Sequence, residues 1–112
     1  MSSLNPYEAF EVLDLRVGRI IQVELNAKAR KASYKLWIDL GELGVKTSSA
    51  QLTELYSTEA LQGRLVICAV NLGVRNIAGF PSEVLVLGLP DAQGRVVLLA
   101  AERDVPLGGR VF

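Results

Sequence analysis

A run of basic residues, KARKASYK at positions 28–35, is the feature of the sequence that most directly suggests chemistry. Its cations are Lys28, Arg30, Lys31 and Lys35. No acidic residue occurs between Glu24 and Asp39, so the run could contact phosphates and bind RNA with a salt-dependent affinity. Tyr34 could stack on a base. The alternative interpretation is a solvated surface loop, which is common for charge runs.

Polar side chains form a second candidate set, because hydroxyls and amides can bind base edges or peptide backbone. The set consists of Ser48, Ser49, Gln51, Asn71, Ser82 and Glu83. For Ser48, Ser49 and Glu83 we favour a structural role in capping strand ends and turns. Gln51 and Asn71 are the stronger binding candidates, because their amides offer a donor and an acceptor.

Three further residues could contact a guest molecule. Trp37 is either an exposed platform or, as we favour for a lone tryptophan, buried under a small helix or in a subunit interface. Arg75 could pair with a phosphate in bidentate fashion. Asn76 could bind the guest or adopt the left-handed conformation of a tight turn.

The composition argues against catalysis. The sequence has no histidine and one cysteine, which excludes Ser–His–Asp and Cys–His mechanisms and most zinc sites. No Walker-type phosphate loop is present, so no use of ATP is predicted. We therefore predict a protein that is not an enzyme, with no cofactor and no metal. Cys68 lies in an apolar run and is predicted to be a buried, inert thiol.

Length and charge set further limits. The 112 residues suit one domain, residues 1–112, and the 50% hydrophobic content can fill a core. The 12 basic and 12 acidic residues give zero net charge, which argues against strong non-specific RNA binding. No segment has the composition of a signal peptide or a membrane helix. We therefore expect a cytoplasmic protein with no membrane insertion.

The predicted elements are mostly short strands. They cover residues 15–25, 35–40, 45–49, 64–70, 83–89 and 96–100, and a turn at 91–94 makes the last two a hairpin. Alternation in the first strand places Val17 and Ile21 on one face and Ile20 on the other, with Gly18 as a bend or bulge. A helical turn capped by Asn5 and a short helix over 52–61 complete the pattern. It predicts an all-β, five-stranded barrel with short helices.

Both ends of the sequence carry more apolar side chains than a small barrel can hide. They are Leu4, Tyr7, Phe10, Val105, Leu107, Val111 and Phe112. Exposed apolar patches mark partner sites, so we expect these residues to build a twofold dimer interface. The alternative is that they pack back on their own barrel.

Several motifs then become recognisable in combination. They are LRVGRII from residue 15, SSAQ from 48, NL from 71, IAGF from 77 and SEVLVLG from 82. Over residues 10–111 the sequence resembles the tRNA-binding domain appended to methionyl- and phenylalanyl-tRNA synthetases. Within that superfamily it is most similar to the CsaA branch of stand-alone, secretion-related chaperones. One departure is Asn76, which stands where the family tends to have a second basic residue.

The resemblance implies an OB fold, a Greek-key barrel whose loop between strands one and two borders a binding groove. It also implies a homodimer that binds tRNA-like RNA in the wider family and unfolded or presecretory polypeptides in the CsaA branch. We expect RNA contacts from Lys28, Arg30, Lys31, Lys35, Arg75 and Ser82. We expect a peptide or RNA groove containing Trp37, Ser48, Gln51, Asn71 and Asn76. The leading hypothesis is an ATP-independent export chaperone, and the alternative is a structure-specific tRNA-binding protein using the same surface.

Overall fold

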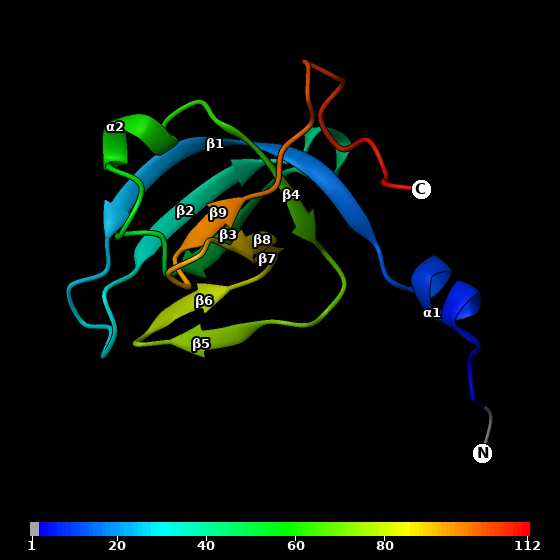
Figure 1. The fold of residues 1–112 in the computed structure, drawn as a ribbon, viewed down its shortest axis with the longest axis horizontal. Helices are drawn as coiled ribbons and strands as arrows, with labels where there is room; N and C mark the ends of the chain where they lie inside the picture. The colour runs from blue at the N-terminus through cyan, green and yellow to red at the C-terminus, as the bar shows by residue number, and fades with distance from the viewer. Residues whose placement is uncertain (1–2) are drawn as a thin grey trace.

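The computed structural model describes residues 3–112 and shows a nearly closed, five-stranded antiparallel barrel with few short helices (Figure 1). The strand order is β3-β2-β1-β4-β7, with β1 (Leu15–Leu25), β2 (Tyr34–Asp39), β3 (Val45–Ala50), β4 (Leu65–Ala69) and β7 (Leu85–Val86). Two small hairpins accompany the barrel: β5 (Arg75–Ile77) with β6 (Phe80–Ser82), and β8 (Gly88–Pro90) with β9 (Val96–Leu98). The predicted OB-type, all-β barrel is confirmed.

The barrel interior is filled by alternate residues of the central strands. Leu36 and Ile38 of β2 are fully buried against Ile20, Val66 and Cys68 from the neighbouring strands. The alternation predicted for this strand is therefore confirmed. Burial raises the pKa of the Cys68 thiol to about 12, because the thiolate would lose its hydration. The cysteine is thus an unreactive part of the core, as predicted.

The alternation predicted for the first strand is wrong at its centre. Ile20 is fully buried and Ile21 is 43% exposed, because the pairing with β2 shifts register between Ile20 and Gln22. Such a bulge turns the following side chains to the other face. The bulge thus lies after Ile20 and not at Gly18, where the sequence analysis expected a bend or bulge. Gly18 is buried, and a Cβ there would lie 2.5 Å from Ile38 Cγ2. Glycine is needed at this position for the close approach of strands β1 and β2.

The helices are short. α1 (Pro6–Val12) is preceded by Asn5, whose side chain forms the predicted N-cap and, with Glu8, a full capping box. The helix predicted over 52–61 is limited to α2 (Thr58–Leu61), which Ser57 caps through the backbone N–H of Ala60. A 3-10 turn, η1 (Gly41–Leu43), joins β2 to β3. No helix within residues 3–112 is long and apolar enough to cross a membrane.

The second half of the chain departs from the predicted strands. The strand predicted over 83–89 is split into β7 and β8. The β5–β6 hairpin was missed, and its tip is a two-residue turn in which Ala78 and Gly79 have φ values of 50° and 85°. The hairpin predicted around residues 91–94 is confirmed by the pairing of β8 with β9.

Candidate functional site

A basic hollow of about 930 Å³ lies beside the barrel, and we call it the basic groove. Three segments meet there: the loop between β1 and β2, the end of β3, and the β5–β6 hairpin. The lining residues are Lys28, Ala29, Arg30, Lys31, Ser33, Ser49, Gln51, Arg75, Asn76, Ile77 and Ala78. The structure therefore brings together Arg75 and Asn76 with the basic loop and Gln51, although they are far apart in sequence.

Asn26 fixes the two walls of the basic groove. Its side chain is buried; Oδ1 accepts from the Lys28 N–H at 3.2 Å, and Nδ2 donates to the Ile77 carbonyl at 3.4 Å. Its backbone N–H donates to the carbonyl of Ser33, which closes the loop. The sequence analysis missed this residue. An asparagine directly after a strand is a signal for such a turn, because its side chain binds nearby backbone groups.

The charges of the basic groove have no counterions within residues 3–112. The ion pairs of this part of the chain involve none of Lys28, Arg30, Lys31 and Arg75. No acidic residue is among those lining the hollow. A concave surface lined by charges of one sign concentrates their potential. The groove is therefore positive and favours an anionic ligand.

No aromatic ring lines the basic groove, and this contradicts the base-stacking role suggested for Tyr34. Tyr34 is 8% exposed and belongs to the core, where its hydroxyl donates to the carbonyl of Tyr56 at 2.8 Å. Trp37 is half-buried, and its ring meets the edge of Phe80 at a centroid distance of 5.4 Å. Its ring is therefore neither a fully exposed platform nor fully buried. The Lys35 ammonium lies 5.5 Å from the centroid of the same Phe80 ring. Lys35 does not line the basic groove.

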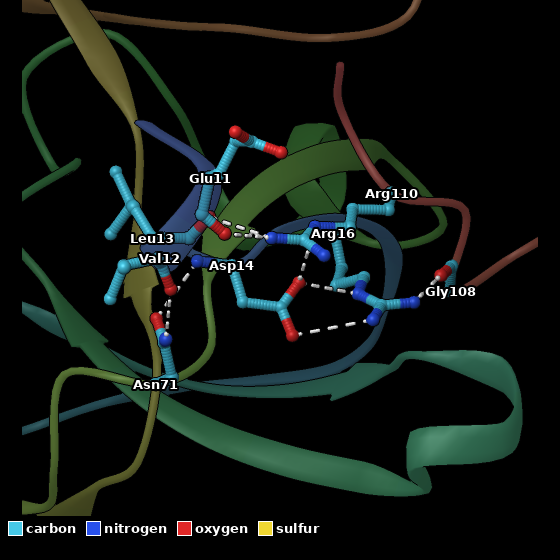
Figure 2. Close-up of polar contacts among 8 residues, drawn as sticks. All are labelled: Glu11, Val12, Leu13, Asp14, Arg16, Asn71, Gly108 and Arg110. Atoms are coloured by element: carbon cyan, nitrogen blue, oxygen red, sulfur yellow. Dashed lines mark hydrogen bonds and ion pairs between the residues drawn. The ribbon is translucent and has the colours of Figure 1, made fainter. Parts of the chain in front are cut away.

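Two of the predicted groove residues have other roles. Ser48 is 1% exposed and faces the barrel interior, where its hydroxyl has no hydrogen-bond partner. Asn71 lies far from the basic loop: its Oδ1 accepts from the Asp14 N–H at 2.9 Å, and its Nδ2 donates to the Val12 carbonyl at 2.8 Å (Figure 2). Their assignment to the groove was wrong, because one side chain is enclosed by the core and the amide of the other is bound to backbone.

Ser82 and Glu83 join β6 to β3. The Ser82 hydroxyl accepts from the Ser49 N–H at 2.9 Å, and Ser82 does not line the basic groove. The Glu83 carboxylate accepts from the N–H and the hydroxyl of Thr47, at 3.0 and 2.9 Å. Glu83 thus has the structural role that we favoured, and the Ser82 hydroxyl is occupied in the same junction.

Helix α1 and the C-terminal segment lie side by side and form a second hollow, of about 350 Å³. We call it the terminal patch; it is lined by Tyr7, Phe10, Glu11, Arg110, Val111 and Phe112. The C-terminal segment runs along β1, where the N–H of Val111 donates to Leu15. Leu4 and Val105 are exposed as well, whereas Leu107 is half-buried and its carbonyl lies close to Gly41. Leu107 therefore packs on its own barrel.

Comparisons with known proteins agree with this geometry. A family model described as "Putative tRNA binding domain" matches residues 15–110. The chaperone CsaA of Bacillus anthracis is 43% identical with a TM-score of 0.89, and the match covers 98% of this chain and 100% of that one. The CsaA chaperone of Picrophilus torridus is 39% identical with a TM-score of 0.89, over 97% and 100% of the two chains.

The curated relatives are much longer proteins. The methionine–tRNA ligase of Pyrococcus abyssi is 37% identical over 105 residues, which are 94% of this chain and 14% of the ligase. The chain thus spans about a seventh of the length of the curated relatives it matches. Within residues 3–112 there is no group of three or more His, Cys, Asp or Glu residues that could hold a metal ion. The family match and the two CsaA structures support a chaperone or tRNA-binding role.

Proposed function

Because this chain belongs to the tRNA-binding domain family, we propose that it is a non-catalytic, CsaA-like homodimeric chaperone that holds unfolded or presecretory polypeptides. It works without ATP in the cytoplasm and assists protein export. The observation that carries the proposal is the end-to-end match with two chaperones, each covered over 100% of its chain. The two chaperones, at 43% and 39% identity, are also more similar in sequence to this chain than the ligase of Pyrococcus abyssi, at 37%.

Exposed apolar side chains support the holding of polypeptides. Away from the chain ends, large apolar residues remain exposed on the β4–β5 connection, on β7 and on the β8–β9 hairpin: Leu72, Val74, Leu85, Leu89, Val96 and Val97. An unfolded chain presents apolar segments that such surfaces can cover. Binding the unfolded state lowers its free concentration by mass action and requires no chemical energy.

The terminal patch supports the homodimer. Tyr7 is 74% exposed and Phe112 is fully exposed, although aromatic residues of this size usually contribute to a core or an interface. Both line the same hollow, together with Phe10. A patch of this kind can be complementary to itself about a twofold axis.

A second function, structure-specific tRNA binding, is favoured by the basic groove. Lys28, Arg30, Lys31 and Arg75 have no counterions there, so phosphates can supply them. Since no aromatic ring lines the hollow, the groove suits the phosphate backbone of folded RNA better than stacked single-stranded bases.

The chaperone proposal is tested by light scattering of a client protein diluted from urea, in buffer without nucleotide. We expect the chain to suppress aggregation at near-stoichiometric ratios, with no change when ATP is added. The variant Leu72→Ser/Val74→Ser should lose most of this suppression. Its matched control, Leu43→Ser/Val45→Ser, makes the same kind of change at exposed apolar residues near the β2–β3 turn and should retain it. Aggregation that proceeds unchanged with the wild-type chain contradicts the proposal.

A further inference from the structure

The C-terminal end of α1 is fixed by side chains from distant parts of the chain (Figure 2). Arg110 donates to the carbonyls of Glu11 and Leu13, and Asn71 donates to the carbonyl of Val12. These carbonyls have no partners within the helix, and a cation beside them also compensates the helix dipole. Three consecutive carbonyls are thus bound by one residue after β4 and one residue of the C-terminal segment.

Asp14 connects these contacts to the barrel. Its carboxylate pairs with Arg16 at 2.6 and 3.3 Å and lies 3.6 Å from Arg110 Nε, while its backbone N–H donates to Asn71. Arg16 also donates to the carbonyl of Gly108 at 3.0 Å. The hydrogen bond to Asp14 is the main cause of a raised pKa of Arg16. We call Asp14, Arg16, Asn71 and Arg110 the polar clasp.

The polar clasp orders a helix that buries no side chain fully in the barrel core. None of the residues of α1 is buried, and Figure 1 shows the helix standing away from the sheet. A helix of seven residues is marginal in water by itself, since short helices do not repay the entropy of nucleation. Its apolar side chains, Tyr7, Phe10 and Val12, are exposed. The helix is thus held by polar contacts at its two ends, while this apolar face stays open to a partner.

We infer that the polar clasp is a mount that sets the direction of α1, so that Tyr7 and Phe10 pack into the terminal patch of a second copy of this chain. A second copy fits because the exposed rings of Tyr7 and Phe10 and the hollow of about 350 Å³ lie on one surface, so each copy offers both sides of an isologous contact. The hollow also contains one acid, Glu11, and one base, Arg110, so two copies can meet with opposite charges. The inference rests on the proposed homodimer and adds the residues that position its interface.

The experiment measures the dimer dissociation constant of the full chain by analytical ultracentrifugation. Asn71→Ala and Arg110→Ala should each raise it about tenfold, because α1 then samples orientations that do not fit the partner. Arg110→Lys keeps a positively charged donor nitrogen near the carbonyls and should recover part of the lost dimer affinity. The matched control is Arg103→Ala, which removes an exposed cation of the C-terminal segment whose only ion-pair partner in the described chain is Glu102. It should leave the constant unchanged.

A second measurement separates positioning from loss of the fold. At concentrations where every variant is monomeric, the barrel should be intact, with Cys68 protected from alkylation, while amide exchange in α1 becomes faster in the clasp variants. A wild-type dimer whose constant is the same in Asn71→Ala, Arg110→Ala and the control overturns the inference and leaves the chaperone proposal standing. A wild-type chain that stays monomeric overturns both the inference and the homodimer. Loss of dimer together with exposure of Cys68 in dilute variants also overturns the inference, since the clasp then serves the barrel.

Discussion

The basic groove and the polar clasp are built from the same kinds of residue, but the charged side chains are paired in the clasp and unpaired in the groove. In the clasp, Arg16 and Arg110 are held by Asp14 and by backbone carbonyls. In the groove, none of the four cations makes an ion pair with the described chain. A charge that is neutralised internally fixes geometry, whereas an unpaired charge keeps its field for a ligand. The partners of a side chain, and not its type, therefore separate architecture from binding.

The largest expected effect comes from removing the charges of the groove. Lys28→Ala/Arg30→Ala/Lys31→Ala should weaken binding of folded tRNA about hundredfold and lower the slope of log affinity against log salt by roughly 2–3, because fewer counterions are released. Filter binding or fluorescence anisotropy across a salt series measures both. The variant should still suppress aggregation of an unfolded client and still dimerise.

A control with the same change in net charge separates the groove from the overall field. Lys46→Ala/Arg64→Ala/Arg103→Ala removes three cations that do not line the hollow. It should change the affinity for tRNA by less than about threefold, because exposed charges at a distance are screened by salt. If both triple variants lose the same affinity, the groove is not the RNA site. If the groove variant also loses aggregation suppression, RNA and polypeptide share one surface.

The reverse effect is expected in the clasp, where a change should leave the affinity for tRNA unaltered. Asp14→Asn should lower the free energy of unfolding and shift the urea midpoint downward, since the charge-assisted hydrogen bonds to Arg16 are lost. Urea denaturation monitored by Trp37 fluorescence measures this. The matched variant in the groove, Arg75→Ala, should change stability by less than about 0.5 kcal/mol and reduce tRNA affinity. A stable Asp14→Asn protein with weakened RNA binding would erase the distinction between the two regions.

The parts of the fold that depend on periodicity could be predicted from the sequence. Leu36 and Ile38 alternate with polar residues, and a strand with one buried face requires this pattern. The assignment of Ile20 and Ile21 failed because a bulge shifts the register, and two adjacent isoleucines do not show which one faces inward. The β5–β6 hairpin was missed because its strands have three residues each, too few for a periodic signal.

The candidate site could be predicted only in part, for a related reason. The basic loop is continuous in the sequence, so its cations were found by composition. Asn71 was misassigned because its partners, Asp14 and Val12, lie 57 and 59 residues away and are backbone groups. Amide chemistry is the same in a binding site and in a clasp, and only the three-dimensional partners distinguish them.

The smallest effect concerns two neighbouring serines that the sequence analysis had grouped together. Ser48 faces the core with an unpaired hydroxyl, whereas Ser49 lines the basic groove. A buried hydroxyl without a partner carries a desolvation cost, so Ser48→Ala should raise the free energy of unfolding by about 1 kcal/mol. Ser49→Ala should leave it within about 0.5 kcal/mol, because only its backbone N–H is used in the junction with Ser82. Parallel urea titrations of the two variants give the comparison, and a destabilised Ser48→Ala protein would show that its hydroxyl has a partner after all.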